Sequence, residues 1–97
     1  MKRTIQISYD LSRPGDEYPR LLAYLQRHQA TKPLAGTWFI KTHRTAFEVR
    51  DDILALAYEE DEIIVLDVTG VAWATTFEDV TTDWMQSEMP LARRRAA

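Results

Sequence analysis

The residue with the clearest chemical potential in this sequence is Asp10, which ends an alternating segment at residues 4–11. Ile5, Ile7 and Tyr9 alternate there with polar residues, which is the pattern of a β-strand with one apolar and one polar face. Asp10 falls on the polar face, where its carboxylate is able to hold a metal ion or a proton. We expect something polar, wet or intermolecular to meet this face, because both faces of a central strand are normally covered.

Two roles are open for Asp10. As a ligand it suits Mg²⁺, which prefers carboxylate oxygens and keeps several of its waters. As a structural residue it caps the loop that follows, where the pair Pro14-Gly15 is typical of a turn. Ser8 shares the polar face and would either orient a metal-bound water or act as an interface hydroxyl. The sequence contains no P-loop, G-x-G-x-x-G, H-E-x-x-H or nucleophile-triad spacing.

The composition is that of one small globular domain, residues 1–97, in which 45% of residues are hydrophobic. A domain of this size buries only about 60–65% of its unfolded surface, so dimerisation would help its stability. The absence of cysteine excludes a thiolate metal site and a disulfide framework. No apolar run is long enough to span a membrane, and the basic start lacks the apolar region of a signal peptide. We therefore expect a cytoplasmic protein without a membrane partner.

Charge is divided unevenly along the chain, although the net charge is only −3. Residues 1–50 carry nine Lys or Arg and four Asp or Glu, whereas residues 51–92 carry eleven acidic residues and no basic one. Such a division favours a basic side that contacts an anion such as RNA or DNA, or else a simply solvated acidic surface. The candidate phosphate contacts are Arg13, Arg44, Arg93, Arg94 and Arg95.

Local signals predict the first half of the fold. Asp16 is a plausible N-cap of a first helix, with Pro19 in its first turn and an apolar stripe beginning at Tyr18. Residues 31–42 predict two strands separated by a turn or bulge at Ala35-Gly36. A second helix is predicted from the capping box of Thr45 and Glu48. Its expected core side comprises Phe47, Val49, Ile53, Leu54, Leu56 and Ala57.

The second half continues with an acidic loop at residues 59–62, which we expect to be solvated. The strongest strand spans residues 62–68, and its alternation places Ile63, Val65 and Asp67 together on the open face. Residues 71–74 predict a short further strand. A last helix is predicted from a cap at Thr76 to Pro90, with Phe77, Val80 and Trp84 on one face.

The resulting order, β-α-β-β-α-β, predicts an α+β fold of the ferredoxin-like split βαβ type, followed by a C-terminal strand and helix. We expect the sheet order 4-1-3-2, with both helices on one face and the other face open. The end of the first strand should then neighbour Thr37 and lie far from Asp67. The core comprises residues 1–75, and the C-terminal helix and basic tail comprise residues 76–97.

Three short segments carry a resemblance. Residues 7–11, ending in Tyr9-Asp10-Leu11, resemble the end of the first strand in the CRISPR-associated small endoribonuclease family, the dimeric partner of the spacer integrase. Gly36-Thr37-Trp38-Phe39 resembles a strand of that family, and residues 45–48 resemble the start of its second helix. VapD-type ribonuclease toxins are similar in fold. The likeness spans residues 4–75 and leaves residues 76–97 outside.

The resemblance implies a homodimer that stacks the open faces of two sheets. It implies further that the two copies of Asp10 share a divalent ion and cleave the phosphodiester bonds of RNA or DNA, with Mg²⁺ as cofactor and Ser8, Tyr9 and Thr37 in support. The alternative is a non-catalytic homodimeric module that binds a protein or nucleic-acid partner, with Arg93, Arg94 and Arg95 at its anion-binding end. A toxin-like ribonuclease and a small-molecule sensor also remain open.

Overall fold

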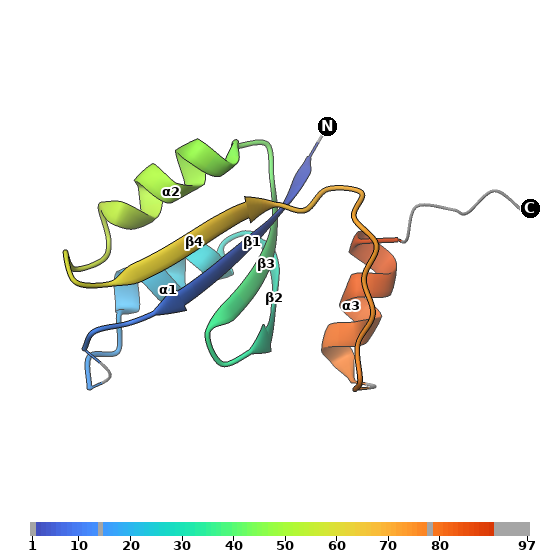
Figure 1. Ribbon diagram of the computed structural model, residues 1–97, viewed down its shortest axis with the longest axis horizontal. Helices are drawn as coiled ribbons and strands as arrows, with labels where there is room; N and C mark the ends of the chain where they lie inside the picture. The colour runs from blue at the N-terminus through green and yellow to red at the C-terminus, as the bar shows by residue number, and fades with distance from the viewer. Residues whose placement is uncertain (1, 14, 78, 91–97) are drawn as a thin grey trace, which may run out of the picture.

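The computed structural model describes residues 2–13, 15–77 and 79–90, and in these residues four strands and three helices form a small α+β fold (Figure 1). The predicted anion-binding residues Arg93, Arg94 and Arg95 lie outside the described residues. In chain order the elements are β1 (Arg3–Asp10), α1 (Pro19–Gln26), β2 (Gln29–Leu34), β3 (Thr37–Thr42), α2 (Ala46–Leu54), β4 (Glu62–Asp67) and α3 (Val80–Glu88). None of these described helices has the length and apolar character needed to cross a membrane.

The four strands form an open antiparallel sheet in the order β2-β3-β1-β4, which from the β4 edge is the expected order 4-1-3-2. In the register of β1 and β3, Ser8 lies opposite Thr37, so the end of β1 neighbours the start of β3 as predicted. Asp67 instead lies opposite Ile5, well away from Asp10. β4 is an edge strand with β1 as its only partner among the described strands.

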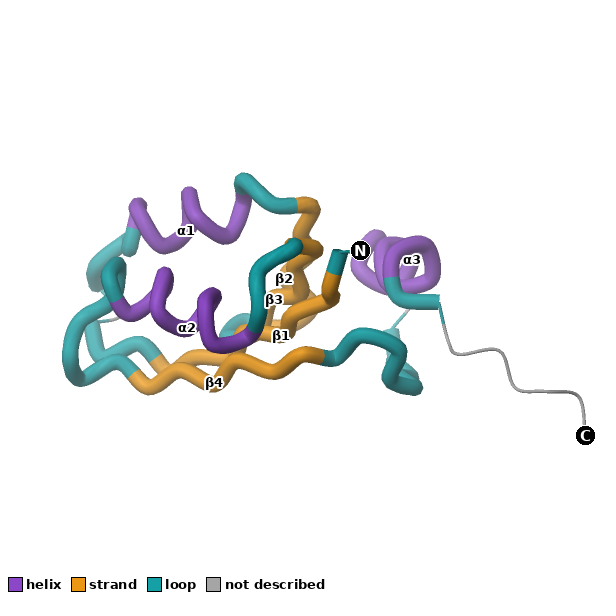
Figure 2. The backbone as a smooth tube through the Cα atoms, turned by 90° about the horizontal axis from the view of Figure 1, so that it is seen from above, coloured by secondary structure: helices purple, strands orange, loops and turns teal. Residues whose placement is uncertain are grey.

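The helices α1 and α2 lie on the same face of the sheet (Figure 2). Beneath them, Ile5 and Ile7 of β1 are completely buried, which confirms the apolar face predicted for this strand. Burial of each such aliphatic side chain contributes roughly 1.5–3 kcal/mol. The other members of this core come from β3 and the two helices: Trp38, Ile40, Tyr18, Leu21, Tyr24, Leu25, Val49 and Ile53.

α1 begins later than the sequence predicts. The residue before a proline is disfavoured in the helical region, and Tyr18, which precedes Pro19, is left-handed with φ 48° and ψ 51°. Tyr18 is therefore the N-cap, and Asp16 assists from outside the helix, where its Oδ1 accepts a hydrogen bond from the Tyr18 backbone N–H at 2.9 Å.

α2 confirms the predicted capping box. The Thr45 side chain accepts from the Glu48 backbone, and the Glu48 side chain accepts from the Thr45 backbone. The predicted core side was too wide, however, because a nine-residue helix presents only one narrow stripe to the sheet. Val49 and Ile53 fill that stripe and are fully buried, whereas Phe47 and Leu54 are 72% and 57% exposed.

The tight connection between β2 and β3 confirms the turn predicted at Ala35-Gly36. Gly36 is required by a close approach, because a Cβ at this position would lie 2.7 Å from the Tyr9 carbonyl oxygen. The Tyr9 backbone N–H donates to the Gly36 carbonyl at 2.8 Å, so pairing continues past the last rung of β1 and β3.

The strand predicted at residues 71–74 is wrong. A turn at residues 68–71, closed by a hydrogen bond from Val71 N–H to the Val68 carbonyl, carries the chain off the sheet. Gly70 sits in this turn with φ 77°, a conformation that glycine adopts without strain. Beyond the turn, the Trp73 indole N–H donates to the Met89 carbonyl, so this segment pairs with the end of α3 rather than with a strand.

α3 also differs from the prediction. Its N-cap is Asp79 rather than Thr76, and the Asp79 carboxylate accepts from the backbone N–H groups of Thr81 and Thr82. The helix packs through Thr81, Thr82 and Met85. Val80, one of the three residues expected to share an apolar face, begins the helix and is 81% exposed.

α3 corrects the expectation that the second face of the sheet stays open. Thr31 of β2 hydrogen-bonds Thr81 of α3, and Lys41 Nζ donates both to Thr4 Oγ1 and to the Glu88 carbonyl, each at 2.8 Å. These sheet residues project from the face opposite the buried Ile5 and Ile40 rows. The described part of the C-terminal segment thus covers the second face at β2, β3 and the first half of β1, and it leaves the face at the end of β1 and at β4 uncovered.

Candidate functional site

Asp10 lies at the end of β1, directly opposite Glu62, the first residue of β4. Opposed residues in an antiparallel pair project to the same side, so the two carboxylates share the uncovered face. Both residues are exposed. The loop after Asp10 is held by a different carboxylate, that of Asp61, which accepts from both the backbone N–H and the hydroxyl of Ser12. The structure therefore assigns the loop-capping role to Asp61 and leaves Asp10 at the surface.

The next two rungs of the β1–β4 pair carry apolar side chains on this same face. Ser8 lies opposite Ile64 and Gln6 lies opposite Leu66; Ile64 is 62% and Leu66 is 48% exposed. We refer to these three rungs, Asp10–Glu62, Ser8–Ile64 and Gln6–Leu66, as the β1–β4 face. It has apolar and uncharged side chains at its centre and a carboxylate pair at one end.

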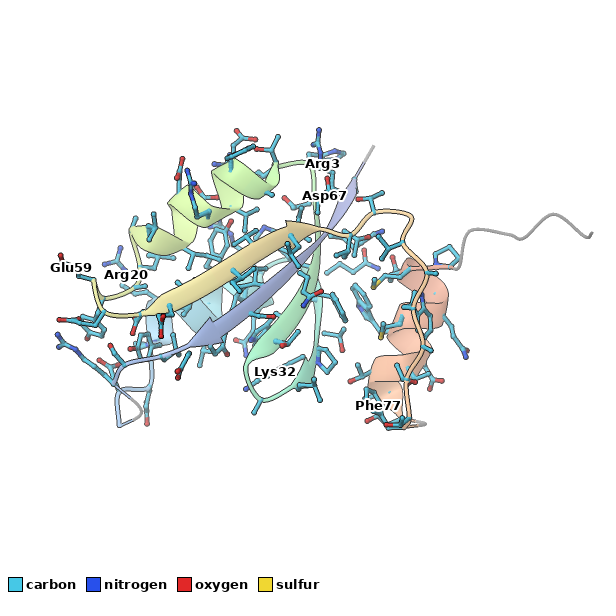
Figure 3. All side chains as sticks on the ribbon, viewed as in Figure 1. Arg3, Arg20, Lys32, Glu59, Asp67 and Phe77 are labelled. Atoms are coloured by element: carbon cyan, nitrogen blue, oxygen red, sulfur yellow. The ribbon has the colours of Figure 1, made fainter. Side chains whose placement is uncertain are left out.

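The predicted alternation of β4 was wrong by one residue. Ile63, Val65 and Asp67 were expected on the open face, but they lie opposite Tyr9, Ile7 and Ile5 and so share the helix-covered side. Ile63 and Val65 pack against the core there. At the strand end, Asp67 forms an ion pair with Arg3 at 3.7 Å, and Figure 3 labels both residues at this place.

An open hollow of about 530 Å³ surrounds the carboxylate pair, and it is lined by Ser8, Tyr9, Asp10, Glu62, Ile63 and Ile64. Ser8 Oγ hydrogen-bonds Thr37 Oγ1 at 3.2 Å and accepts from the Gln6 amide at 3.2 Å. The predicted supporting residues Ser8 and Thr37 are thus brought together beside Asp10.

Tyr9 supports the site from the opposite side of the sheet. Its hydroxyl accepts a hydrogen bond from the Trp38 indole N–H at 3.0 Å, and its ring packs against the core. The side chain therefore faces the helices rather than the Asp10 carboxylate. Its contribution is to fix the end of β1 against β3.

Sequence reasoning missed a polar cluster just beyond Asp10 and Glu62, which we call the loop clamp. Asp61 Oδ1 accepts from Ser12 N–H at 2.7 Å, Ser12 Oγ at 2.6 Å and Tyr18 Oη at 2.9 Å. Asp61 Oδ2 accepts from the Tyr58 N–H at 2.8 Å, and the Tyr58 hydroxyl donates a short hydrogen bond to Asp16. The clamp consists of Ser12, Asp16, Tyr18, Tyr58 and Asp61, and it joins the β1–α1 loop to the α2–β4 loop.

The loop clamp shifts the pKa values of its aspartates and of its tyrosines in opposite directions. Burial raises the pKa of Asp61, but the hydrogen bonds from Ser12, Tyr58 and Tyr18 outweigh this effect and lower the pKa to about 2. The Tyr58 hydroxyl likewise lowers the pKa of Asp16. Burial and the hydrogen bond to Asp61 raise the pKa of Tyr18. Both aspartates are therefore ionised acceptors, and the phenols stay protonated donors.

The loop clamp positions the candidate site. Ser12 follows Asp10 by two residues and Asp61 directly precedes Glu62, so the clamp closes the strand pair beside the rung that carries both carboxylates. It also holds Tyr18 in its left-handed conformation, which costs a non-glycine residue about 1–2 kcal/mol. Acidic composition alone predicted a solvated loop at residues 59–62; only the proximity of Ser12, Tyr18 and Tyr58 in the fold reveals the role of Asp61.

Of the predicted phosphate contacts, the two that lie among the described residues, Arg13 and Arg44, do not share one basic patch. The Arg13 guanidinium lies 3.6 Å above the centre of the Tyr58 ring, beyond the end of β1. Arg44 follows β3 at the other end of the sheet and makes two hydrogen bonds to Asp52, at 2.6 and 2.8 Å. The hydrogen bond to Asp52 raises the pKa of Arg44. Both side chains thus have structural partners, and they lie at opposite ends of the central strands.

The fit of this site to a divalent ion depends on how many acidic ligands meet. Among residues 2–13, 15–77 and 79–90, no group of three or more His, Cys, Asp or Glu side chains is placed to hold a metal. One chain brings the carboxylates of Asp10 and Glu62 to the same rung, and water supplies much of the coordination of Mg²⁺. A second copy placed against this face would add two more carboxylates.

Comparison with known proteins found no family model, no curated protein and no solved structure that matches this chain.

Proposed function

We propose that this protein is a homodimeric module that associates through the β1–β4 face. The observation that carries the proposal is the exposure of Ile64 and Leu66 on the uncovered face of the edge strand β4. The occupant that we propose for this face is a second copy of the chain, because the rungs Ser8–Ile64 and Gln6–Leu66 carry no formal charge. An isologous contact can then bring the apolar side chains of the two copies together without opposing like charges at these two rungs.

The element order and the strand order support a ferredoxin-like split βαβ core, with α1 and α2 on one face. We retain the resemblance to CRISPR-associated small endoribonucleases and VapD-type toxins as part of the proposal. That resemblance implied stacking of whole open faces. Since α3 occupies the second face at β2 and β3, the association we propose is restricted to the β1–β4 part.

The expected association is weak. Completing the burial of a half-exposed Ile or Leu contributes on the order of 1 kcal/mol each, and two copies bring four such side chains together. Association costs about 4–15 kcal/mol in lost translational and rotational freedom before any contact is counted. The four side chains offset only the lower end of this cost, so the remaining contacts of the face must supply the net affinity, and we expect dissociation in the high-micromolar range or weaker.

Light scattering coupled to size-exclusion chromatography, from roughly 10 to 500 μM protein, tests this proposal. The wild-type chain should shift from monomer to dimer, and Ile64→Glu should remain monomeric because it places a charge in an apolar contact. Leu54→Glu is the matched control, since Leu54 is similarly exposed, at 57%, but lies on α2. A wild-type chain that stays monomeric throughout, or equal dimerisation by both variants, would refute the proposal.

A second function, metal-dependent cleavage of RNA or DNA, is favoured by the Asp10–Glu62 rung at the end of the same face. When bound, a divalent ion such as Mg²⁺ polarises a phosphoryl oxygen and lowers the pKa of a water molecule. The carboxylates of Asp10 and Glu62 would hold that ion, with their counterparts in a second copy, and Ser8 would orient a nearby water. The alternative is a non-catalytic module whose partner, a protein or a nucleic acid, binds without being cleaved.

A further inference from the structure

A cleft of about 370 Å³ lies between the sheet and the C-terminal segment. Its floor is formed by Gln6, Thr37 and Phe39, from the second face of β1 and β3. Its outer wall is formed by Phe77 and Met85 among others. Figure 3 labels Phe77 in the segment that leads into α3. The cleft therefore depends on the packing of α3 against the second face of the sheet.

The lining defines the chemistry of a ligand. Among the residues that the structure describes, none that lines the cleft carries a formal charge. Two aromatic rings and a thioether, from Phe39, Phe77 and Met85, provide flat and polarisable walls. Such walls suit a neutral ring. A charged ligand would lose its hydration here without gaining an opposite charge.

The polar side chains of the cleft are Gln6 and Thr37 on its floor and Thr75 and Thr76 on its outer wall. The Gln6 side-chain nitrogen Nε2 donates to Ser8 Oγ at 3.2 Å. The side-chain oxygen Oε1 of Gln6 is then the acceptor for a ligand. The Thr37 hydroxyl already pairs with Ser8 and is held in place by that bond. An apolar cleft with one or two fixed polar groups, at a boundary between packed elements, is the usual form of a small-molecule site.

The floor and the outer wall of the cleft differ in their rigidity. The floor belongs to paired strands, whereas residues 71–77 contain no regular secondary structure and follow the turn at Gly70. Ala74 and Thr76, on this outer wall, are exposed to solvent. The outer wall is thus able to adjust to a ligand while the floor keeps its polar groups in place. The volume also lies within the range of about 300–1,000 Å³ typical of ligand pockets.

We propose that this cleft binds a small, neutral, ring-containing molecule that carries one hydroxyl or amide donor. The ring of the ligand would lie between Phe39 and Met85, and its hydroxyl or amide donor would reach the side-chain oxygen Oε1 of Gln6. The cleft shares Gln6 with the β1–β4 face, but Ile64 and Leu66, which carry the proposed dimer contact, do not line it. Loss of dimerisation would therefore leave this proposal standing.

The experiment uses 1-naphthol as the probe and naphthalene-1-sulfonate as its charged counterpart with the same ring. Titrations are followed by the ¹³C-methyl resonance of Met85 and by backbone amide resonances. We expect saturable shifts at Met85, Phe39 and Gln6 with 1-naphthol. We expect the sulfonate to bind at least 10-fold more weakly, because the described lining of the cleft offers no cation to receive it.

Two variants locate the site, and one control separates filling of the cleft from a general disturbance. Ala74→Phe places a ring in the cleft and should abolish 1-naphthol binding. Ala72→Phe, on the same exposed segment but outside the lining, should leave binding unchanged. Gln6→Leu should weaken 1-naphthol binding about 3- to 10-fold through the lost hydrogen bond.

The outcomes separate cleanly. Saturable binding that disappears in Ala74→Phe and persists in both Ala72→Phe and Ile64→Glu supports the proposal. Absence of saturation up to the solubility of 1-naphthol overturns it, as does equal binding by Ala74→Phe or preferential binding of the sulfonate. If Ala74→Phe fails to give a native amide spectrum, the Gln6→Leu titration decides, and unchanged affinity there overturns the proposal.

Discussion

Asp61 and Ser12 are 49 residues apart in sequence, yet one carboxylate oxygen of Asp61 accepts both the backbone N–H and the hydroxyl of Ser12. This link lies just beyond the rung of Asp10 and Glu62. It ties the loop that follows β1 directly to the loop that precedes β4. The chemistry proposed for Asp10 therefore depends on a carboxylate that is itself unavailable for metal binding.

Asp61→Ala should destabilise the fold by about 2 kcal/mol, since it removes the acceptor of four hydrogen bonds and leaves the Ser12 and Tyr58 N–H groups unpaired. In a domain of this size such a loss lowers Tm by roughly 8–16 °C. Thermal unfolding followed by circular dichroism measures it. Glu59→Ala is the control, because Glu59 is exposed on the same loop. A Tm shift no larger than that of Glu59→Ala would contradict the role of the clamp.

The clamp also predicts how stability depends on pH. In the folded protein the pKa of Asp61 is about 2, below the value of about 3.9 for an unperturbed Asp. The stabilisation from its ionised form is therefore fully present above pH 4 and is lost as the pH falls through 2. Urea unfolding at pH 5, 4, 3 and 2 measures this loss. Asp61→Asn should show a smaller fall over that interval; an identical fall would assign the acid sensitivity to other carboxylates.

Local signals predicted those parts of the fold that depend on near neighbours. The capping box of Thr45 and Glu48 and the turn at Ala35-Gly36 each involve residues at most three apart. The burial of Ile5 and Ile7 follows from alternation in a strand that also contains polar residues. In each case the competing conformations of the same short segment are much less favourable, so sequence sufficed.

Features that depend on distant contacts were not predictable. β4 contains four consecutive apolar residues, so alternation could not decide its buried side; the pairing of Ser8 with Ile64 decides it. The segment at 71–74 has strand-forming residues, but the turn at Gly70 and the bond from Trp73 to Met89 direct it to α3. At the candidate site, Asp10 was identified from the sequence. Glu62 could be identified only from the register of β1 and β4, which places it opposite Asp10.

Gly36→Ala tests the close approach that ends β1. The added methyl group would lie 2.7 Å from the Tyr9 carbonyl oxygen, so the backbone must separate and the hydrogen bond between Tyr9 and Gly36 must weaken. We expect destabilisation of about 1–2 kcal/mol, measured by urea unfolding. Gly15→Ala is the matched control, because a Cβ there meets nothing within 4 Å. Equal stabilities of the two variants would show that β1 ends without this contact.

The carboxylate rung predicts where a divalent ion would bind. Mn²⁺, added as a paramagnetic substitute for Mg²⁺, should broaden the amide resonances of Asp10, Glu62 and Ser8 before others. Asp10→Asn should reduce this effect at least 10-fold, because one of two opposed carboxylates is removed. The matched control is Asp83→Asn, which removes an exposed carboxylate on α3. Broadening that begins elsewhere or survives in Asp10→Asn would exclude an ion at this rung.

The same variants separate the two functions that we propose for the β1–β4 face. If the face cleaves nucleic acid, Mg²⁺-dependent degradation of single-stranded RNA or DNA should be lost in Asp10→Asn while the dimer persists in light scattering. Ile64→Glu should lose both dimerisation and cleavage. Cleavage is lost because the carboxylates that one chain contributes do not complete the metal site. If the module is non-catalytic, wild type shows no cleavage at any Mg²⁺ concentration and only Ile64→Glu changes the oligomeric state. Cleavage that persists in Ile64→Glu monomers would require a site within one chain and would contradict the shared-ion arrangement.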